Sequence, residues 1–123
     1  MNLALWIVAG ILAAVYLGTG ITKLAYSREK LHPQMPWVDD FSTTTVKLIG
    51  AAEVLGAVGL IVPQATGVAE ILTRAAAVGL AALQVGAISV HLRRHETENI
   101  GLNVFLLLAA VFVALGRALG WGA

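Results

Sequence analysis

Four long apolar stretches alternate with three polar segments along the chain. Residues 1–22 carry no charged side chain, and three further apolar runs follow. A helix needs roughly 20 apolar residues to cross the hydrocarbon core of a bilayer. The pattern therefore predicts an all-α membrane protein, a bundle of four transmembrane helices in a single domain over residues 1–123. The predicted helices span residues 3–25, 43–62, 69–93 and 100–119.

The polar segments between these stretches indicate where helices begin and end. The second predicted helix begins after Ser42, whose hydroxyl can cap it, and ends at Pro63, which lacks a backbone N–H group. The longest connection, residues 26–42, reads YSREKLHPQMPWVDDFS. It contains Trp37 and Phe41, whose rings suit the headgroup zone of a bilayer. We expect this connection to form a loop on the membrane surface.

Composition favours a lipid environment and excludes several classes of function. Hydrophobic residues make up 59% of the chain and charged residues 12%, whereas a soluble domain carries about 25% charged residues. The lipid bilayer is therefore the predicted partner. A formal net charge of +1 excludes a strongly basic protein, so no nucleic-acid partner is expected. The chain has no cysteine, which excludes disulfide bonds and thiol redox chemistry.

Basic side chains are distributed unevenly between the two ends of the predicted bundle. We call the end with the first and third loops the loop face, and the end with both termini the terminal face. Arg74 and Arg117 lie near the terminal face. The positive-inside rule places the more basic side in the cytoplasm, and hence both termini outside. The basic residues near the loop face are Lys23, Arg28, Lys30, Lys47, Arg93 and Arg94.

One carboxylate, Glu53, interrupts the apolar run KLIGAAEVLGAVGLIVP of the second helix. An ionisable residue at such depth costs roughly 2.5–3.5 kcal/mol on insertion scales, which favours an inward orientation and a partner. Gly50 and Gly56 stand on either side of it in the sequence, and their missing side chains leave room for a neighbouring helix or a ligand. Lys23, at the end of the first helix, is the expected partner.

The other helices also place polar residues in the half of the bundle near the loop face. Tyr16 and Lys23 share one face of the first helix, and Gln84 and His91 share one face of the third. Asn103 lies in the first turn of the fourth. If these faces point inward, the bundle encloses a polar pocket that opens toward the loop face. We expect catalytic, acid–base roles for Glu53, His91 and Lys23, and ligand-binding roles for Tyr16, Gln84, Asn103, Gly50 and Gly56.

The same residues also have purely structural interpretations. Glu53 can serve only to lock the bundle through a nearby lysine, and Lys23 can simply extend toward the headgroups. Amides such as Gln84 commonly form hydrogen bonds between membrane helices. His91 and His95 are one helical turn apart, but two ligands are too few for a closed metal site, so no metal is expected.

Two further sets of residues are interpreted as packing features. Small residues recur at helical spacing on the first and third helices, and let membrane helices approach closely within one bundle or in a homodimer. Glu70 and Arg74, also one turn apart, are expected to form a local ion pair. The small residues are Ala14, Gly18, Ala75, Gly79, Ala82 and Gly86.

Three segments carry a family resemblance through their order and spacing. They are GITKL at 20–24, IGAAEVLGAVGLIVP at 49–63 and AAVGLAALQVGAISVHLRR at 76–94. The most specific elements are a G-x-x-K that ends at Lys23 and a G-x-x-E that ends at Glu53. Together they resemble the DoxX-like family, which consists of small bacterial membrane proteins with four helices. The resemblance covers most of the chain and implies a multi-pass protein of a bacterial plasma membrane.

The resemblance also implies a class of function. Some members of the family are subunits of a thiosulfate:quinone oxidoreductase, and others are associated with membrane redox complexes and oxidative-stress defence. Lys23, Glu53 and His91 match recurrent polar positions of the family. We therefore expect a pocket that binds a quinone or another lipophilic small molecule, in a membrane subunit of a redox system. No cofactor is built into the chain, so electrons are expected from a soluble or membrane-bound redox partner.

Three other functions are compatible with the same residues. In an intramembrane isomerase, cyclase or hydrolase, Glu53 and His91 exchange protons with a lipophilic metabolite, and Lys23 stabilises developing negative charge. A small proton-coupled transporter has a similar size, but the small multidrug exporters carry their key glutamate in the first helix, where this chain has none. A scaffold subunit needs no ligand at all.

Overall fold

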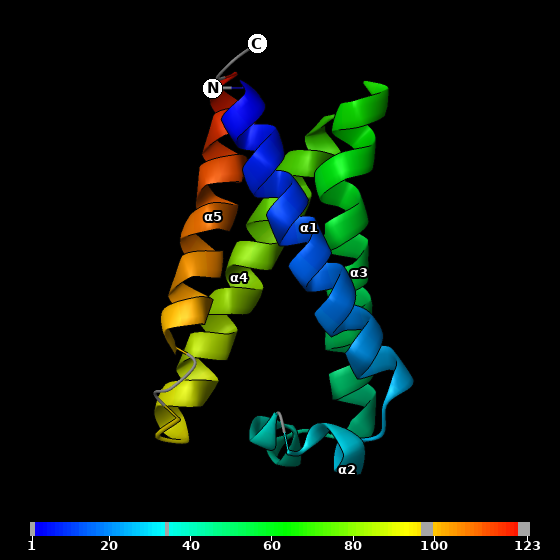
Figure 1. Cartoon of the computed structure of the whole chain (residues 1–123), viewed down its shortest axis with the longest axis vertical. Coiled ribbons are helices and arrows are strands. Elements are labelled where there is room, and N and C mark those ends of the chain that lie inside the picture. The colour runs from blue at the N-terminus through cyan, green and yellow to red at the C-terminus, as the bar shows by residue number, and fades with distance from the viewer. Residues whose placement is uncertain (1, 34, 97–99, 121–123) are drawn as a thin grey trace.

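The protein is built from four long helices and a short, partly helical connection (Figure 1). The computed structural model describes residues 2–33, 35–96 and 100–120. Each long helix is apolar enough to cross a membrane, and the described residues contain no strand. The predicted all-α fold with four membrane helices is confirmed. The long helices are α1 (Asn2–Ala25), α3 (Thr43–Thr66), α4 (Ile71–Arg93) and α5 (Ile100–Leu119).

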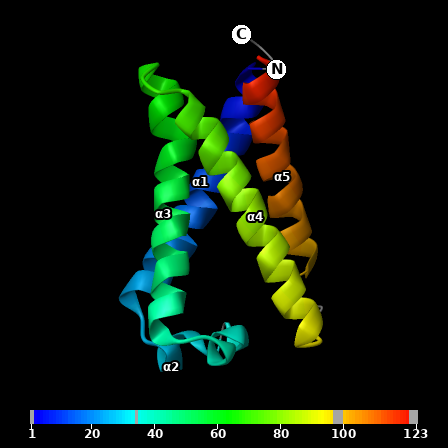
Figure 2. The ribbon, with the colours of Figure 1, turned by 180° about the vertical axis from the view of Figure 1, so that it is seen from behind.

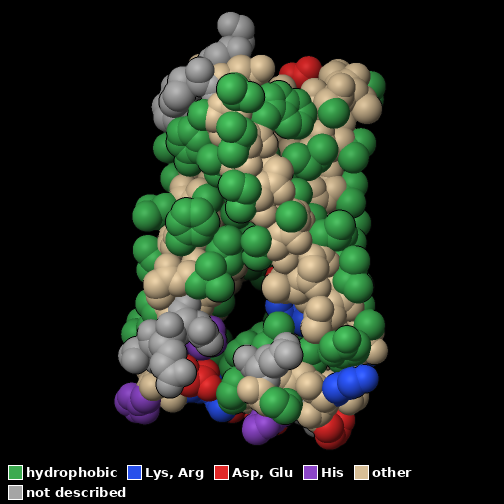
Figure 3. Space-filling model, in the orientation of Figure 1, with side chains coloured by type: hydrophobic (Ala, Val, Ile, Leu, Met, Phe, Trp, Pro, Cys, Tyr) green, Lys and Arg blue, Asp and Glu red, His purple; other side chains and the backbone are tan. Residues whose placement is uncertain are grey.

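The long helices form two pairs that spread apart toward the loop face. There α1 lies beside α3, and α4 lies beside α5 (Figures 1 and 2). Toward the terminal face α1 approaches α5 and α3 approaches α4, so the pairs converge. The space-filling view is hollowed between the two pairs near the loop face (Figure 3). The opening therefore lies at the end of the bundle where the polar side chains are concentrated.

The hydrophobic core runs along the middle of the bundle. It includes Tyr16 of α1, Leu60 of α3, Leu80 of α4 and Val113 of α5, all of which are buried. The outer faces are apolar as well, which is typical of helices whose surroundings are lipid (Figure 3). Large exposed side chains occur on every long helix, among them Ile7, Leu55, Leu72 and Leu108.

Glycines set the closest approach of α1 and α3. A Cβ atom on Gly20 would lie 2.7 Å from the carbonyl oxygen of Gly50, and one on Gly50 would lie 2.8 Å from Cβ of Lys23. On another face of α3, a Cβ atom on Gly56 would lie 2.7 Å from the side chain of Leu80. A neighbouring helix therefore occupies the space beside Gly50 and Gly56, which was one of the two predicted uses of that space.

The prediction that Pro63 ends its helix is wrong. Pro63 lies inside α3, which continues for one further turn to Thr66. Membrane helices tolerate proline where hydroxyl side chains and neighbouring helices satisfy the freed backbone groups. The carbonyl group that Pro63 leaves without its helical N–H partner is that of Gly59. The hydroxyl of Thr66 bonds a different one, the carbonyl oxygen of Val62, at 2.9 Å. The helix ends at Gly67, whose left-handed φ of 70° stops it, and Ala69, with φ of 53°, delays the start of α4 beyond the predicted residue.

The small-residue seams on α1 and α4 face outward, which corrects their interpretation as contacts within the bundle. All six residues of these seams are exposed. A Cβ atom added to Gly18, Gly79 or Gly86 would meet no neighbouring atom within 4 Å. Close helix contacts fall instead on Gly20 and Gly50. A homodimer through the outward seams stays a prediction.

The connection from α1 to α3, residues 26–42, is folded on itself. We call it the surface segment; it crosses the loop-face end of the bundle (Figure 1). Leu31 and Val38 are buried and form a second small core with Val46 of α3. Ser42 caps α3 as predicted, because its hydroxyl accepts a hydrogen bond from a backbone N–H group of the first turn at 3.1 Å. The short helices of the segment are α2 (Arg28–Leu31) and η1 (Pro36–Asp40).

Candidate functional site

A buried ion pair joins α1 to α3 near the loop face. Lys23 lies in the last turn of α1 and Glu53 in the first half of α3, and both side chains are buried. The Nζ atom of Lys23 donates a hydrogen bond to Oε1 of Glu53. The contact is possible because Gly20 and Gly50 let the two backbones approach closely. Glu53 thus has the partner that the sequence predicts.

Thr19 holds the second oxygen of the same carboxylate. Its hydroxyl donates a hydrogen bond to Oε2 of Glu53 at 2.7 Å. Both oxygens of Glu53 therefore accept a hydrogen bond from α1, which defines the orientation of the carboxylate. Thr19 is not among the residues predicted from the sequence, although it stands one helical turn before Lys23 and so shares its face.

Trp37 of the surface segment covers the lysine. Its ring centroid lies 5.6 Å from Nζ of Lys23, within the range of a cation–π interaction. The ring also packs edge-on against Phe41, with centroids 5.7 Å apart. Trp37 was assigned from the sequence only to the headgroup zone, because nothing local indicates which helix end it meets. The ammonium group of Lys23 thus lies between a carboxylate and an aromatic ring.

A second polar contact connects α1 to α4. Nε2 of Gln84 donates a hydrogen bond to the hydroxyl oxygen of Tyr16 at 2.6 Å, and both side chains are buried. The Oε1 atom of Gln84 is buried and has no hydrogen-bond partner among the described residues. Gln84 therefore links α1 to α4 through its amide nitrogen, while its amide oxygen stays without a partner among the described residues.

His91 belongs to a different group of charges, at the end of α4. Its Nδ1 atom lies 3.2 Å from Oε1 of Glu96, and no hydrogen bond or ion pair among the described residues joins it to Glu53. Arg94 pairs with the same Glu96 and with Asp40 of the surface segment, at 3.2 and 2.8 Å. The hydrogen bond to Asp40 raises the pKa of Arg94 above its ordinary value. These charges connect the surface segment to α4.

The predicted pocket residues are distributed over both helix pairs. Lys23 and Glu53 belong to the α1–α3 pair, whereas Gln84 and His91 are buried on α4. Asn103 of α5 is partly buried, and its Nδ2 atom has no hydrogen-bond partner among the described residues. Tyr16 and Gln84 meet between the two helix pairs. No hydrogen bond or ion pair among the described residues joins His91 or Asn103 to Glu53.

Metal-binding side chains do not gather in the described part of the chain. It contains no group of three or more His, Cys, Asp or Glu residues that could hold a metal ion. His95 is exposed and adopts a left-handed φ of 59°, one residue beyond the cap of α4. Residues 97–99 of the predicted third loop lie outside the described residues.

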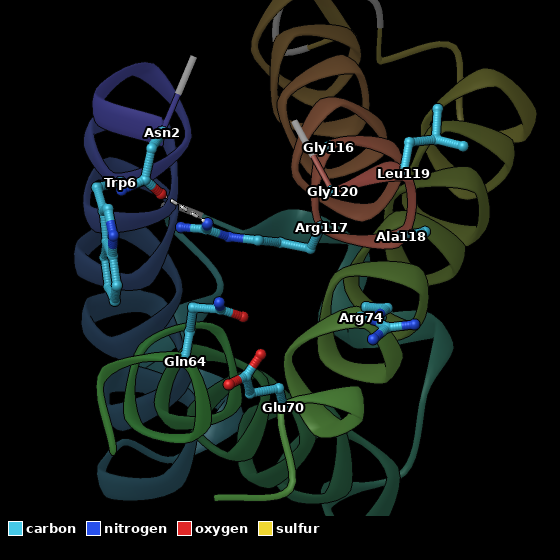
Figure 4. Close-up of a pocket in the computed structure, with 10 residues that line it drawn as sticks. All are labelled: Asn2, Trp6, Gln64, Glu70, Arg74, Gly116, Arg117, Ala118, Leu119 and Gly120. Atoms are coloured by element: carbon cyan, nitrogen blue, oxygen red, sulfur yellow. Dashed lines mark hydrogen bonds between the residues drawn. The ribbon is translucent and has the colours of Figure 1, made fainter. Parts of the chain in front are cut away.

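The predicted local ion pair at the start of α4 is not formed. None of the ion pairs among the described residues joins Glu70 to Arg74. Glu70 lies just before the first turn of α4, where it interacts electrostatically with Arg117 of α5. Glu70 itself has helical backbone angles, φ of −56° and ψ of −22°, so the spacing was right for a pair within one helix. The two side chains point in different directions instead (Figure 4).

Comparison with known proteins identifies one family. The sequence model described as the DoxX-like family matches residues 7–113, which is most of the chain. No curated protein and no solved structure gives a significant match. The matched range contains the buried ion pair, the Tyr16–Gln84 hydrogen bond and the whole surface segment.

Proposed function

The chain belongs to the DoxX-like family, and on that premise we propose that it binds a quinone or a similar lipophilic molecule as a membrane subunit of a redox system. The observation that supports this most directly is the buried Lys23–Glu53 pair, which lies in the half of the bundle where the helix pairs spread apart. An intramembrane ionisable group is costly, and in membrane proteins it commonly marks a site of ligand or proton traffic.

The pair provides donors for a carbonyl oxygen of the ligand. The Lys23 ammonium group has three N–H groups, and one of them is bound by Glu53. A further N–H group can point into the hollow and donate a hydrogen bond to an oxygen of the ligand. Trp37, which already contacts the ammonium group, offers an aromatic face at the same place. On α4 and α5, the unpartnered amide atoms of Gln84 and Asn103 can bind the distal end of the molecule.

Glu53 is suited to exchange protons with the ligand. Reduction of a quinone needs protons as well as electrons, and Glu53 and the hydroxyl of Thr19 are hydrogen-bonded inside the bundle. Electrons come from a soluble or membrane-bound partner, because the cysteine-free chain has no thiol pair or iron–sulfur ligand of its own. The loop face then lies in the cytoplasm of a bacterial cell, on the more basic side of the plasma membrane.

The proposal is tested by quinone binding to the full chain in lipid nanodiscs. We expect saturable binding of a soluble ubiquinone or menaquinone analogue, weakened about tenfold or more by Lys23→Gln, since one charge-assisted hydrogen bond is lost. Lys30→Gln, an exposed charge on the surface segment, is the matched control and should bind like the wild type. Absence of saturable binding to the wild type, with the protein folded, would refute the proposal.

The orientation of the carboxylate supports one second candidate, an acid–base enzyme acting on a lipophilic metabolite. Donors from Thr19 and Lys23 hold Glu53 in a single position, as a general base requires. The two functions differ in the effect of Glu53→Gln. In an enzyme of this kind the substitution abolishes turnover and leaves ligand affinity largely intact. A quinone-binding subunit, by contrast, shows no turnover in isolation, with or without the substitution.

A further inference from the structure

A separate cavity opens at the terminal face, at the opposite end of the bundle from Glu53. Its volume is about 590 Å³, which lies within the range of roughly 300–1,000 Å³ typical of small-molecule sites. The ends of all four long helices contribute to it, and the side chains of Gln64, Glu70 and Arg117 point toward its centre (Figure 4). The polar and aromatic residues that matter for its chemistry are Asn2, Trp6, Gln64, Glu70, Arg74 and Arg117.

Arg117 reaches across this cavity from α5 toward α1 (Figure 4). Its Nη1 atom donates a hydrogen bond to Oδ1 of Asn2 at 2.9 Å, and its guanidinium carbon lies 5.0 Å from the ring centroid of Trp6. The Nε and Nη2 atoms are buried and have no hydrogen-bond partner among the described residues. These two nitrogens form one edge of the guanidinium group, whose parallel N–H groups match two oxygens of a carboxylate or phosphate.

The charge of the cavity also favours an anion. Its lining contains two arginines, Arg74 and Arg117, and one carboxylate, Glu70, so the formal sum is 2 − 1 = +1. Glu70 interacts electrostatically with Arg117, but no ion pair among the described residues connects them. Buried N–H donors without an acceptor are costly, and Arg117, although only partly buried as a residue, has two of them. A ligand with a single negative charge would supply that acceptor.

We propose that this cavity binds the phosphodiester headgroup of a phospholipid. The cavity lies at the ends of the membrane-spanning helices, which is the depth at which lipid phosphates are found, and it is far larger than a lone phosphate requires. Two free phosphate oxygens accept hydrogen bonds from Nε and Nη2 once the Arg117 side chain rotates to expose these buried atoms to the cavity. Gln64 and Glu70, which point into the same space, face the hydroxyl or ammonium substituent of the headgroup (Figure 4).

The test uses the full chain in a maltoside detergent, which contains no phosphate. Short-chain phosphatidylglycerol, short-chain phosphatidylethanolamine and inorganic phosphate are titrated separately, and adducts are counted by native mass spectrometry. We expect saturable binding of one lipid molecule of either class and no binding of inorganic phosphate at the same concentration. Arg117→Gln should weaken lipid binding by about tenfold or more. Arg93→Gln, an exposed charge at the loop face, should have no effect.

Each alternative result overturns the proposal. Inorganic phosphate that binds as well as the lipids identifies a free anion as the ligand, and no saturable lipid binding to the wild type removes the site. If Arg117→Gln does not fold, Arg74→Gln takes its place, because Arg74 is exposed and lines the same cavity. Arg74→Gln should weaken lipid binding severalfold. A variant that binds the lipid as tightly as the wild type refutes the proposed site. Quinone binding near Glu53 is measured independently, so failure of either site is distinguishable.

Discussion

The two ends of the bundle differ in the partners that they provide for a basic side chain. At the loop face, Lys23 is held by a carboxylate and an aromatic ring, both from this chain. At the terminal face, Arg117 has an amide and an aromatic ring, and no carboxylate forms an ion pair with it among the described residues. Burial penalises a charge unless it is paired. The loop-face charge is therefore paired within the protein, whereas the terminal-face charge keeps two N–H donors without an acceptor.

The largest expected effect comes from Lys23→Met, which leaves Glu53 buried without its cation. Breaking a buried pair on one side costs about 3–5 kcal/mol of unfolding free energy, because the remaining charge has no compensation. The measurement is reversible denaturation in mixed micelles. The double variant Lys23→Met/Glu53→Leu should recover most of the loss, since it removes both charges.

The matched change at the other end is Arg117→Met, measured in the same micelles. We expect a smaller loss of stability than for Lys23→Met, because no carboxylate ion pair is broken. Equal losses of stability for the two variants would show that the carboxylate partner of Lys23 makes no difference.

Gly20→Ala tests the helix crossing that brings the loop-face pair together. The added methyl group would lie 2.7 Å from the carbonyl oxygen of Gly50, and backbone cannot move aside as a side chain can. Overpacking of this kind costs about 1–3 kcal/mol. Gly18→Ala is the control on the same helix, where a methyl group meets no neighbour within 4 Å. Similar losses at both positions would show that the crossing does not depend on the missing side chain.

Gln84→Leu probes the contact between α1 and α4. Hydrogen bonds between membrane helices contribute about 0.6 kcal/mol on average, so the loss of stability should be small. The same change removes an amide oxygen that we propose binds the ligand. The loss of binding free energy for the quinone should therefore exceed the loss of unfolding free energy. If affinity is unchanged while the hydrogen bond to Tyr16 is lost, Gln84 only braces the helices.

Arg94→Gln is expected to have the smallest effect on stability and a local effect on dynamics. Its ion pair with Asp40 lies outside the membrane helices and is accessible to solvent. Surface pairs of this kind contribute little to global stability. Hydrogen exchange should increase in residues 36–40, where the surface segment loses its connection to α4. Unchanged protection in that segment would show that its own small core is sufficient to hold it.

Much of this architecture follows from local pattern. The four helices, the cap at Ser42 and the inward orientation of Glu53 each depend on residues within a few turns of the feature itself. Thr19 could also have been predicted from the sequence, because it stands one turn before Lys23 on the same face. Pro63 shows where local pattern fails: proline is a strong helix breaker in water, but here it lies inside a membrane helix that continues to Thr66.

The apolar pattern alone determines that this chain is a four-helix membrane protein, because every residue that faces lipid must be apolar whichever helix lies beside it. The order and spacing of its short motifs likewise indicate the DoxX-like family. Only the tertiary structure decides which helices meet: it directs the small-residue seams outward, places Trp37 over Lys23 and separates His91 from Glu53. The reason is that lipid and protein are equally apolar surroundings, so sequence hydrophobicity does not distinguish the side of a helix that packs from the side that faces the bilayer.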